Sequence, residues 1–265
     1  MARKARETSL TGIYHVMLRG INRQDIFLDR DDYWKFVKIL HQQVNPKDEL
    51  GNPLPPKCDI YSYCLMPNHL HLLIRNRTED LGSVVKSIGI AYASYFNKRY
   101  ERVGHLFQDR FRSEPVNDMN YFVTLIRYIH QNPVAGGLAK RVEDYPWSSW
   151  IEFESPARCQ MPVCTTSAVT HRISMDELKG LVDEPLSKAA VVLEFSKEER
   201  EQQAEEDLRA FLTTHFGISD PQELCDLPES ERDAILQAAH HMGVSIRRLA
   251  HLTGLTIYSI HKSVR

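Results

Sequence analysis

The 265-residue sequence predicts an α+β protein: a ferredoxin-like, RRM-like antiparallel sheet with helices on one face, followed by a small all-α helix-turn-helix domain. Over the first 135 residues, β-forming and amphipathic helical segments alternate in the order β-α-β-β-α-β-α. The two consecutive β segments are separated by a tight turn, which is typical of a hairpin. Residues 228–265 hold short helical segments interrupted by a glycine, which favours a separate helical unit.

Three β segments and one helix make up the first half of this pattern. Residues 11–20 are rich in β-forming side chains, and residues 31–44 repeat apolar side chains at helical spacing behind an acidic start. Residues 58–66 and 69–75 follow as two strands around the turn at 67–68.

A long helix is predicted over residues 78–100, because its apolar side chains recur every three or four positions. Residues 105–116 are expected to form a fourth strand or irregular β segment. Asp118 is a good N-cap for the next helix, and Pro133 is expected to stop that helix.

Charge is distributed unevenly along the chain. Residues 1–150 carry 21 Lys/Arg against 16 Asp/Glu, residues 151–233 carry 8 against 19, and residues 234–265 carry 4 against none. Basic segments suit phosphate-bearing partners. The predicted domains are 1–150, the α+β domain; 151–204, an acidic and partly helical linker; and 205–265, a helical domain.

Several classes of protein are excluded by composition. No apolar run approaches the ~20 residues that a membrane helix needs, and the basic N-terminus has no apolar stretch behind it, so we expect a cytoplasmic protein without a membrane partner. The five cysteines are an odd number without a CxxC, which argues against a disulfide framework. Cys159, Cys164 and His171 are at most a weak zinc set, and free thiols are the alternative.

His69 and His71 flank a leucine on a predicted strand. Residues i and i+2 of a strand share one face, so two imidazoles ~6–7 Å apart can converge on one cation. The alternative is an ordinary pair of surface or hydrogen-bonded histidines.

Tyr128 and Asn132 stand four residues apart on a predicted helix, which places a phenol and an amide on one face. Asn132 precedes Pro133, which weakens its helical geometry. A half-buried core tyrosine is the alternative for Tyr128, and Tyr121 lies on the same face and competes for any role.

These two pairs complement each other chemically. A phenol has a pKa near ~10 and is a weak nucleophile at neutral pH, so phosphodiester cleavage by tyrosine needs an electrophilic clamp on the phosphate. Two imidazoles and an amide oxygen leave positions open for phosphate and water oxygens, which favours Mg²⁺ or Mn²⁺ as the cofactor.

Four motifs resemble those of the REP-associated tyrosine transposases, which belong to the single-tyrosine HUH (His-hydrophobic-His) transposase superfamily. The matching segments are YHVMLRGINRQDIF at 14–27, LMPNHLHLLI at 65–74, GHLFQDRFRS at 104–113 and RYIHQNPV at 127–134. They follow the family's order, and the resemblance covers roughly residues 8–150.

The resemblance implies a ferredoxin-like nuclease core with His69 and His71 as metal ligands and Tyr128 as the nucleophile. Asn132 would take the place of the superfamily's third, polar ligand. The implied reaction is cleavage of single-stranded DNA at hairpin-forming repeats, with a 5′-phosphotyrosine link and a free 3′-OH. A covalent link of this kind conserves the bond energy for rejoining.

DNA is expected to contact basic and aromatic side chains, since single strands are bound through phosphates and stacked bases. The candidates in the matching motifs are Arg19, Arg23, Arg110 and Arg112, with Tyr14, Phe107 and Phe111 as stacking surfaces. Lys98, Arg99 and Arg102 are further basic candidates at the end of the long helix. Core packing is the alternative for each aromatic residue.

The C-terminal residues fit a helix-turn-helix. Gly254 lies in the predicted turn and Thr256 is a good N-cap for the second helix. Arg247 and Arg248 are predicted to contact the DNA backbone. The residues predicted to face a major groove are Tyr258, Ser259, Lys262 and Ser263. A helical hairpin for protein contacts is the alternative.

Three functions are compatible with parts of this sequence pattern. A metal-dependent DNA endonuclease and strand-transferase accounts for the paired histidines, Tyr128 and Asn132 together. A catalytically idle regulator that binds repeat DNA would not need them. An RRM-like RNA-binding module shares the topology, but the aromatic RNP motif is absent from the sequence. The expected partner is single-stranded or hairpin DNA, with association to the bacterial nucleoid, and both a monomer and a homodimer are left open.

Overall fold

A computed structural model describes residues 7–108, 110–184, 208–241, 244 and 246–264. The chain divides into two compact units, Met1–Leu193 and Glu194–Arg265. Within the described residues, no helix combines the length and apolar character needed to cross a membrane.

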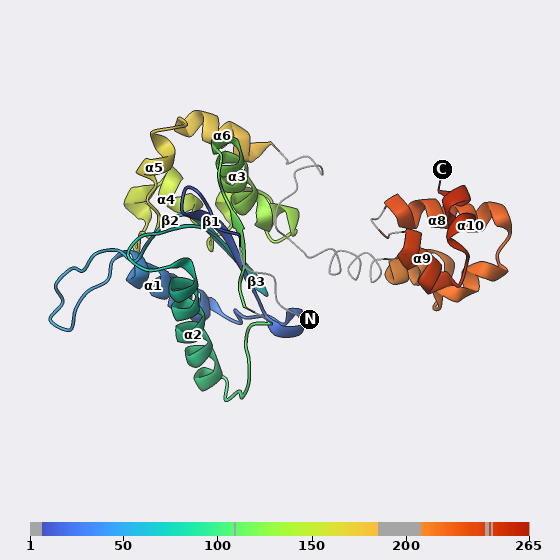
Figure 1. The fold of residues 1–265 in the computed structure, drawn as a ribbon, viewed down its shortest axis with the longest axis horizontal. Helices are drawn as coiled ribbons and strands as arrows, with labels where there is room; N and C mark the ends of the chain where they lie inside the picture. The colour runs from blue at the N-terminus through green and yellow to red at the C-terminus, as the bar shows by residue number, and fades with distance from the viewer. Residues whose placement is uncertain (1–6, 109, 185–207, 242–243, 245, 265) are drawn as a thin grey trace. The chain divides into compact units, whose positions relative to one another are not determined.

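The first unit is built around one four-stranded antiparallel sheet (Figure 1). Its strands are β1 (Ile13–Arg19), β2 (Cys58–Met66), β3 (His69–Asn76) and β4 (Arg112–Pro115). The order across the sheet is β2-β3-β1-β4, and every neighbouring pair is antiparallel. This order confirms the predicted ferredoxin-like α+β fold. Strand β4 is shorter than predicted, because most of 105–111 is irregular.

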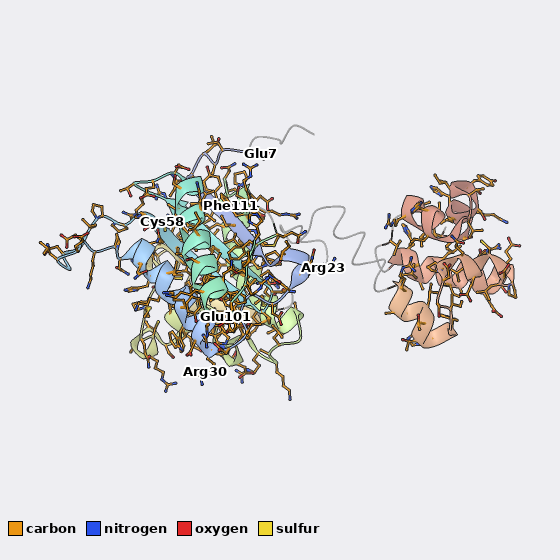
Figure 2. All side chains as sticks on the ribbon, turned by 90° about the horizontal axis from the view of Figure 1, so that it is seen from below. Glu7, Arg23, Arg30, Cys58, Glu101 and Phe111 are labelled. Atoms are coloured by element: carbon orange, nitrogen blue, oxygen red, sulfur yellow. The ribbon has the colours of Figure 1, made fainter. Side chains whose placement is uncertain are left out.

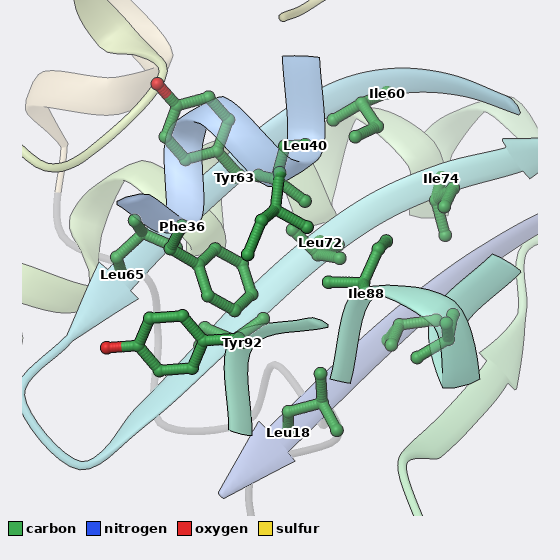
Figure 3. Packing of buried hydrophobic residues seen from close by; sticks show 14 of the residues in the cluster. Leu18, Phe36, Leu40, Ile60, Tyr63, Leu65, Leu72, Ile74, Ile88 and Tyr92 are labelled. Atoms are coloured by element: carbon green, nitrogen blue, oxygen red, sulfur yellow. The ribbon is translucent and has the colours of Figure 1, made fainter. Parts of the chain in front are cut away.

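Helices α1 (Arg30–Val44) and α2 (Leu81–Arg99) cover one face of the sheet. Asp29 and Asp80 cap their N-termini by accepting hydrogen bonds from backbone N–H groups in the first turns. Tyr92 of α2 is fully buried among apolar side chains of α1 and the sheet (Figure 3). Its hydroxyl donates to the Ile26 carbonyl at 2.5 Å, so its polar atom is satisfied inside the core.

Arg99, one of the basic residues expected to contact DNA, has a structural role instead. Its guanidinium bridges α2 to the start of α1 through Asp29 at 2.5 Å and the fully buried Asp32 at 3.1 Å. Tyr95 and Tyr100 also donate to Asp32, at 3.1 and 2.8 Å. A buried carboxylate needs such partners, and this network links the end of α2 to the start of α1.

Helix α3 (Met119–Ala135) packs against the opposite face of the sheet, where it forms a second core with Leu73, Cys64 and Met66. The prediction that helices lie on one face therefore holds for α1 and α2 but not for α3. Both faces of β2 are buried as a result. Pro133 does not stop α3 as predicted, because it stands in the last turn, where only one intrahelical hydrogen bond is lost.

The described part of the predicted linker 151–204 is packed structure. It contains α4 (Trp150–Glu154), α5 (Ser167–Thr170) and α6 (Met175–Asp183), with η2 (Val142–Asp144) before them and η3 (Pro156–Arg158) between them. Phe153, Val169 and Leu178 are buried in the α3-side core. Helices this short show little periodicity, so the sequence predicted only a partly helical segment here. Residues 185–204 lie outside the described residues.

The second unit has a core of its own. Its named elements are η4 (Pro221–Asp226), α8 (Glu229–His241), α9 (Ile246–Thr253) and α10 (Ile257–Ser263). Leu236, Leu249 and Ile260 are fully buried in that core. Thr256 caps α10 by accepting from the Ser259 N–H at 3.1 Å, as predicted. Gly254, with φ of 75°, makes the turn between α9 and α10.

We expect Gly20→Ala to destabilise the first unit by about 1–3 kcal/mol, since overpacking a tight contact costs this much. A Cβ at Gly20 would lie 2.2 Å from the Gln24 carbonyl oxygen and 2.9 Å from Ile26. Gly89→Ala is the matched control: its Cβ meets only the Phe107 ring at 3.9 Å, inside a helix, where alanine is favoured. Urea unfolding of both variants measures the difference. Equal stabilities would contradict the packing described at Gly20.

Candidate active site

Strand register places the histidines on the α3 side of the sheet. His69 stands opposite Arg19 and His71 opposite Met17, while Val16 and Leu18 face the α1/α2 core. Successive strand residues alternate between faces, so His15, Met17 and Arg19 share the histidine face. Strand β4 adds Arg112, opposite Met17, to the same face.

His69 begins β3 directly after the β2–β3 turn and is partly exposed. Its Nδ1 lies 2.6 Å from the Oδ1 of Asn68. An amide oxygen only accepts, so Nδ1 carries the proton and donates. The Nε2 atom then keeps its lone pair, which is the state that a metal ligand requires.

His71 is fully buried. Its Nδ1 lies 3.0 Å from the Nε2 of His15, and the two rings stack with centroids 5.1 Å apart. Its Nε2 has no hydrogen-bond partner among the described residues. His15 was not identified from the sequence, although period-two alternation along 11–20 places it on the face of Arg19.

Burial keeps all three imidazoles neutral at physiological pH. It lowers the pKa of His15 to about 3. Burial, with the nearby Arg19 charge as a second cause, lowers the pKa of His69 to about 4. The pKa of His71 is lowered well below its usual value, first by burial and then by His69, His15 and Arg19. Neutral imidazoles are the ligand form, so protons do not compete for this site near pH 7.

Tyr128 projects from α3 onto this histidine group. Its ring lies edge-to-face with His71 at 5.4 Å between centroids, and with His15 at 6.0 Å. The side chain is 9% exposed. The competing Tyr121 differs, because its hydroxyl donates to Glu114 at 2.6 Å. Burial and that carboxylate raise the pKa of Tyr121. Of the two tyrosines, Tyr128 is the one against the imidazoles.

Asn132 lies one turn beyond Tyr128 in a continuous helix, so the predicted shared face is present. Its Nδ2 donates to the Tyr128 carbonyl at 3.1 Å, which leaves Oδ1 as the atom able to meet a metal. Among the described residues, no three His, Cys, Asp or Glu side chains are grouped to hold a metal ion. The buried Nε2 of His71 and the neutral His69 still fit a two-imidazole site whose other ligands are oxygens.

The predicted arginines occupy different surroundings. Arg19 and Arg112 flank the histidine face by register. Arg23 lies in the short helix η1 (Ile21–Arg23), where its φ of 58° is left-handed, at the surface of the unit (Figure 2). Arg110 lines a cavity on the other side of the sheet, so the four arginines do not form one group.

That cavity measures about 610 Å³ and lies between α2 and residues 104–111. Phe107, Phe111 and Lys86 line it together with Arg110, and Phe111 is labelled beside α2 in Figure 2. Phe107 and Phe111, two of the aromatic residues predicted to stack on bases, are both partly exposed. The third, Tyr14, is buried in the core and its hydroxyl accepts from the Ser9 N–H at 3.0 Å, so the prediction of a stacking role there is wrong.

In the second unit, Tyr258 is 82% exposed on α10, and Lys262 forms an exposed ion pair with Glu229 at 3.2 Å. Ser259 is half-buried, and Arg248 is half-buried on α9. Ser263 does not face outward as predicted, because it is buried and its hydroxyl donates to Asp233 at 2.6 Å. The side chain of Arg247 lies outside the described residues.

A ferredoxin-like sheet that carries a His-Leu-His strand beneath a helical tyrosine is the arrangement that the resemblance to single-tyrosine transposases predicts. Residues 8–132 match the sequence model of the family described as "Transposase IS200 like". This match covers a little under half of the chain, and it confirms the resemblance to REP-associated tyrosine transposases.

Individual proteins that are similar to this chain carry transposase names. A Haemophilus influenzae protein named as a REP-associated tyrosine transposase is 28% identical over 122 residues, covering 39% of this chain and 68% of the relative. A REP-associated tyrosine transposase solved with a REP hairpin is 20% identical, with a TM-score of 0.46, over 62% of this chain and 90% of that one. A Deinococcus radiodurans transposase structure has 16% identity and a TM-score of 0.32, over 49% and 97%.

Proposed function

We propose that this protein is a metal-dependent endonuclease and strand-transferase for single-stranded DNA, acting beside hairpin-forming repeats through a 5′-phosphotyrosine intermediate. The observation that carries the proposal is the position of the Tyr128 ring, 5.4 Å from that of His71, in a family of transposases. The similarity to a protein named as a REP-associated tyrosine transposase supports repeat DNA hairpins as the partner.

His69 and His71 are the residues that would hold Mg²⁺ or Mn²⁺, with Asn132 Oδ1 as a third ligand. A divalent ion there would polarise the phosphate and stabilise the leaving oxygen. The protein's own contribution is to keep both imidazoles neutral and to hold the phenol against them. Arg19 and Arg112, on the same face, would bind the phosphates on either side of the scissile bond.

In the cleavage step, the Tyr128 oxygen attacks phosphorus and its proton passes to solvent. The bond from phosphorus to the 3′ oxygen breaks, and the 3′ oxygen takes up a proton. The 5′ phosphate stays on the tyrosine, so no external energy source is needed when a 3′-OH later reverses the reaction.

The test is incubation of the full chain with Mn²⁺ and a 5′- or 3′-labelled single-stranded hairpin carrying flanking nucleotides, followed by a denaturing gel. We expect a protein-DNA adduct that contains the fragment 3′ of the cut and therefore carries the 3′ label. We expect this adduct to be absent when EDTA is added. Hairpin binding without any cut or adduct would contradict the enzymatic proposal and leave an idle DNA-binding protein.

The second unit is proposed to bind double-stranded DNA through its helix-turn-helix. The buried Ile260 and the capped start of α10 orient this helix with Tyr258 and Lys262 outward. Exposed tyrosine and lysine side chains on a recognition helix suit a major groove and its phosphates.

We expect Lys262→Ala to weaken duplex binding and to reduce the salt dependence of log K by about one, because one phosphate contact is lost. Lys179→Ala is the matched control, since Lys179 forms an ion pair of the same length, 3.2 Å, with Glu154 in the first unit. Fluorescence anisotropy over a salt series measures both. An unchanged slope for Lys262→Ala would remove Lys262 from the proposed DNA contact.

A further inference from the structure

His15 is a buried imidazole with a defined contact that the proposed reaction does not use. It is fully buried on β1, and its Nε2 lies 3.0 Å from the Nδ1 of His71. A neutral imidazole carries one N–H and one lone pair, so one ring must donate across this contact while the other accepts.

The direction of this hydrogen bond decides whether His71 can bind a metal. If His71 Nδ1 donates, its Nε2 keeps a lone pair. If His15 donates, the proton of His71 stands on Nε2, which then cannot be a ligand. Within the described residues Nε2 has no hydrogen-bond partner, so nothing else there holds the proton in either place.

We propose that His15 is a positioning residue: it accepts the Nδ1–H of His71 and thereby fixes the tautomer that presents Nε2 to a divalent cation. This inference rests on the proposed metal-dependent function. Asn68 does the same for His69 by accepting its Nδ1–H at 2.6 Å. The two imidazoles thus have matching outer partners, one amide oxygen and one imidazole nitrogen. Partners of this kind are typical of histidine metal ligands and typically affect metal affinity by about 10–100-fold.

The ring stack gives His15 a second possible role, which is packing. Its ring lies 5.1 Å from that of His71 and 6.0 Å from that of Tyr128. Two substitutions separate the roles. His15→Phe keeps an aromatic ring but has no acceptor, whereas His15→Gln gives up the ring and keeps an oxygen at a similar reach.

The experiment is a Mn²⁺ titration of the full chain without DNA, following free Mn²⁺ by electron paramagnetic resonance. We expect His15→Phe to raise the Kd by about 10–100-fold and His15→Gln to stay within a few-fold of the wild type. The reverse order, with Phe close to wild type and Gln impaired, would show that packing is the role and overturn the proposal.

A spectroscopic readout checks the tautomer directly. In ¹⁵N-labelled protein saturated with Mg²⁺, we expect the His71 Nδ1 to have the chemical shift of a protonated ring nitrogen. A protonated Nε2 on His71 under these conditions would overturn the proposal. Failure of the proposed metal-dependent function would look different from failure of the role of His15. In that case the wild-type protein itself would bind no Mn²⁺, and any adduct would also form in the presence of EDTA.

Discussion

Replacing Tyr128 by phenylalanine is expected to abolish the covalent protein-DNA adduct while hairpin binding survives. The substitution removes one oxygen, the proposed nucleophile, and leaves the ring packed against His71 and His15. Losing a nucleophile from a covalent mechanism reduces the rate by several orders of magnitude, so adduct formation should fall by at least ~10³-fold. The measurement is a single-turnover time course on a denaturing gel, with hairpin affinity measured in parallel.

Tyr121→Phe is the matched control, because it removes the same atom from the same helix face. The Tyr121 hydroxyl is hydrogen-bonded to Glu114, so its loss should leave the adduct at near wild-type levels. A Tyr128→Phe protein that still forms the adduct, with Tyr121→Phe inactive, would transfer the nucleophile to Tyr121.

Loss of either metal-facing imidazole should remove both metal binding and cutting. We expect His69→Ala and His71→Ala to lower the cleavage rate by ~10²–10⁴-fold, because a metal at a phosphate is worth several kcal/mol of transition-state stabilisation. The effect of His71→Ala should be accompanied by a fall in unfolding temperature, since the residue is fully buried. His69 is partly exposed, and its variant should keep its stability.

A Mn²⁺ dose-response of cleavage, with the Mn²⁺ Kd from paramagnetic resonance, measures this effect. His171→Ala is the control, since His171 is exposed at the end of α5 and should change neither quantity. Full cleavage by His69→Ala with an unaltered Mn²⁺ optimum would show that His69 is not a ligand.

The strands of the sheet and their order along the chain could be predicted from the sequence, because hydrophobic periodicity is a property of each short segment. Strand β3 combines period-two alternation with a tight turn before it, and this pattern also placed His69 and His71 on one face. The side taken by α3 could not be predicted in the same way. An amphipathic helix shows that it has a buried face, but not which side of a sheet that face meets. Strand β2 is buried along its whole length, and the predominance of apolar side chains in it is the signal that both sides are covered.

Only those residues of the site that lie in recognisable motifs could be predicted from the sequence. Tyr128 and His71 come together from positions 57 apart, and family resemblance rather than periodicity paired them. His15 was missed because a single histidine in a strand carries no spacing signal, and its importance lies in an atom-to-atom contact with His71. The pairing of Arg99 was missed for a similar reason. A basic residue at a helix end can contact DNA or pair with a buried carboxylate, and only the structure shows that Asp32 is its partner.

The helices of residues 150–183 were predicted from the sequence only as a partly helical segment. Helix α6, the longest of them, has nine residues, and its two fully or almost fully buried side chains are Leu178 and Val182. A nine-residue helix is too short to be stable by itself, so tertiary packing against α3 stabilises this segment.

The central claim, that the Tyr128 oxygen becomes joined to DNA, is tested most directly by mapping the adduct. The adduct formed with Mn²⁺ would be digested with protease and nuclease, and the nucleotide-bearing peptide sequenced by tandem mass spectrometry. The account predicts a 5′-phosphonucleotide on Tyr128, inside the peptide that follows Arg127. A nucleotide on Tyr121 or on any other side chain, or a 3′-phosphate linkage, would contradict it.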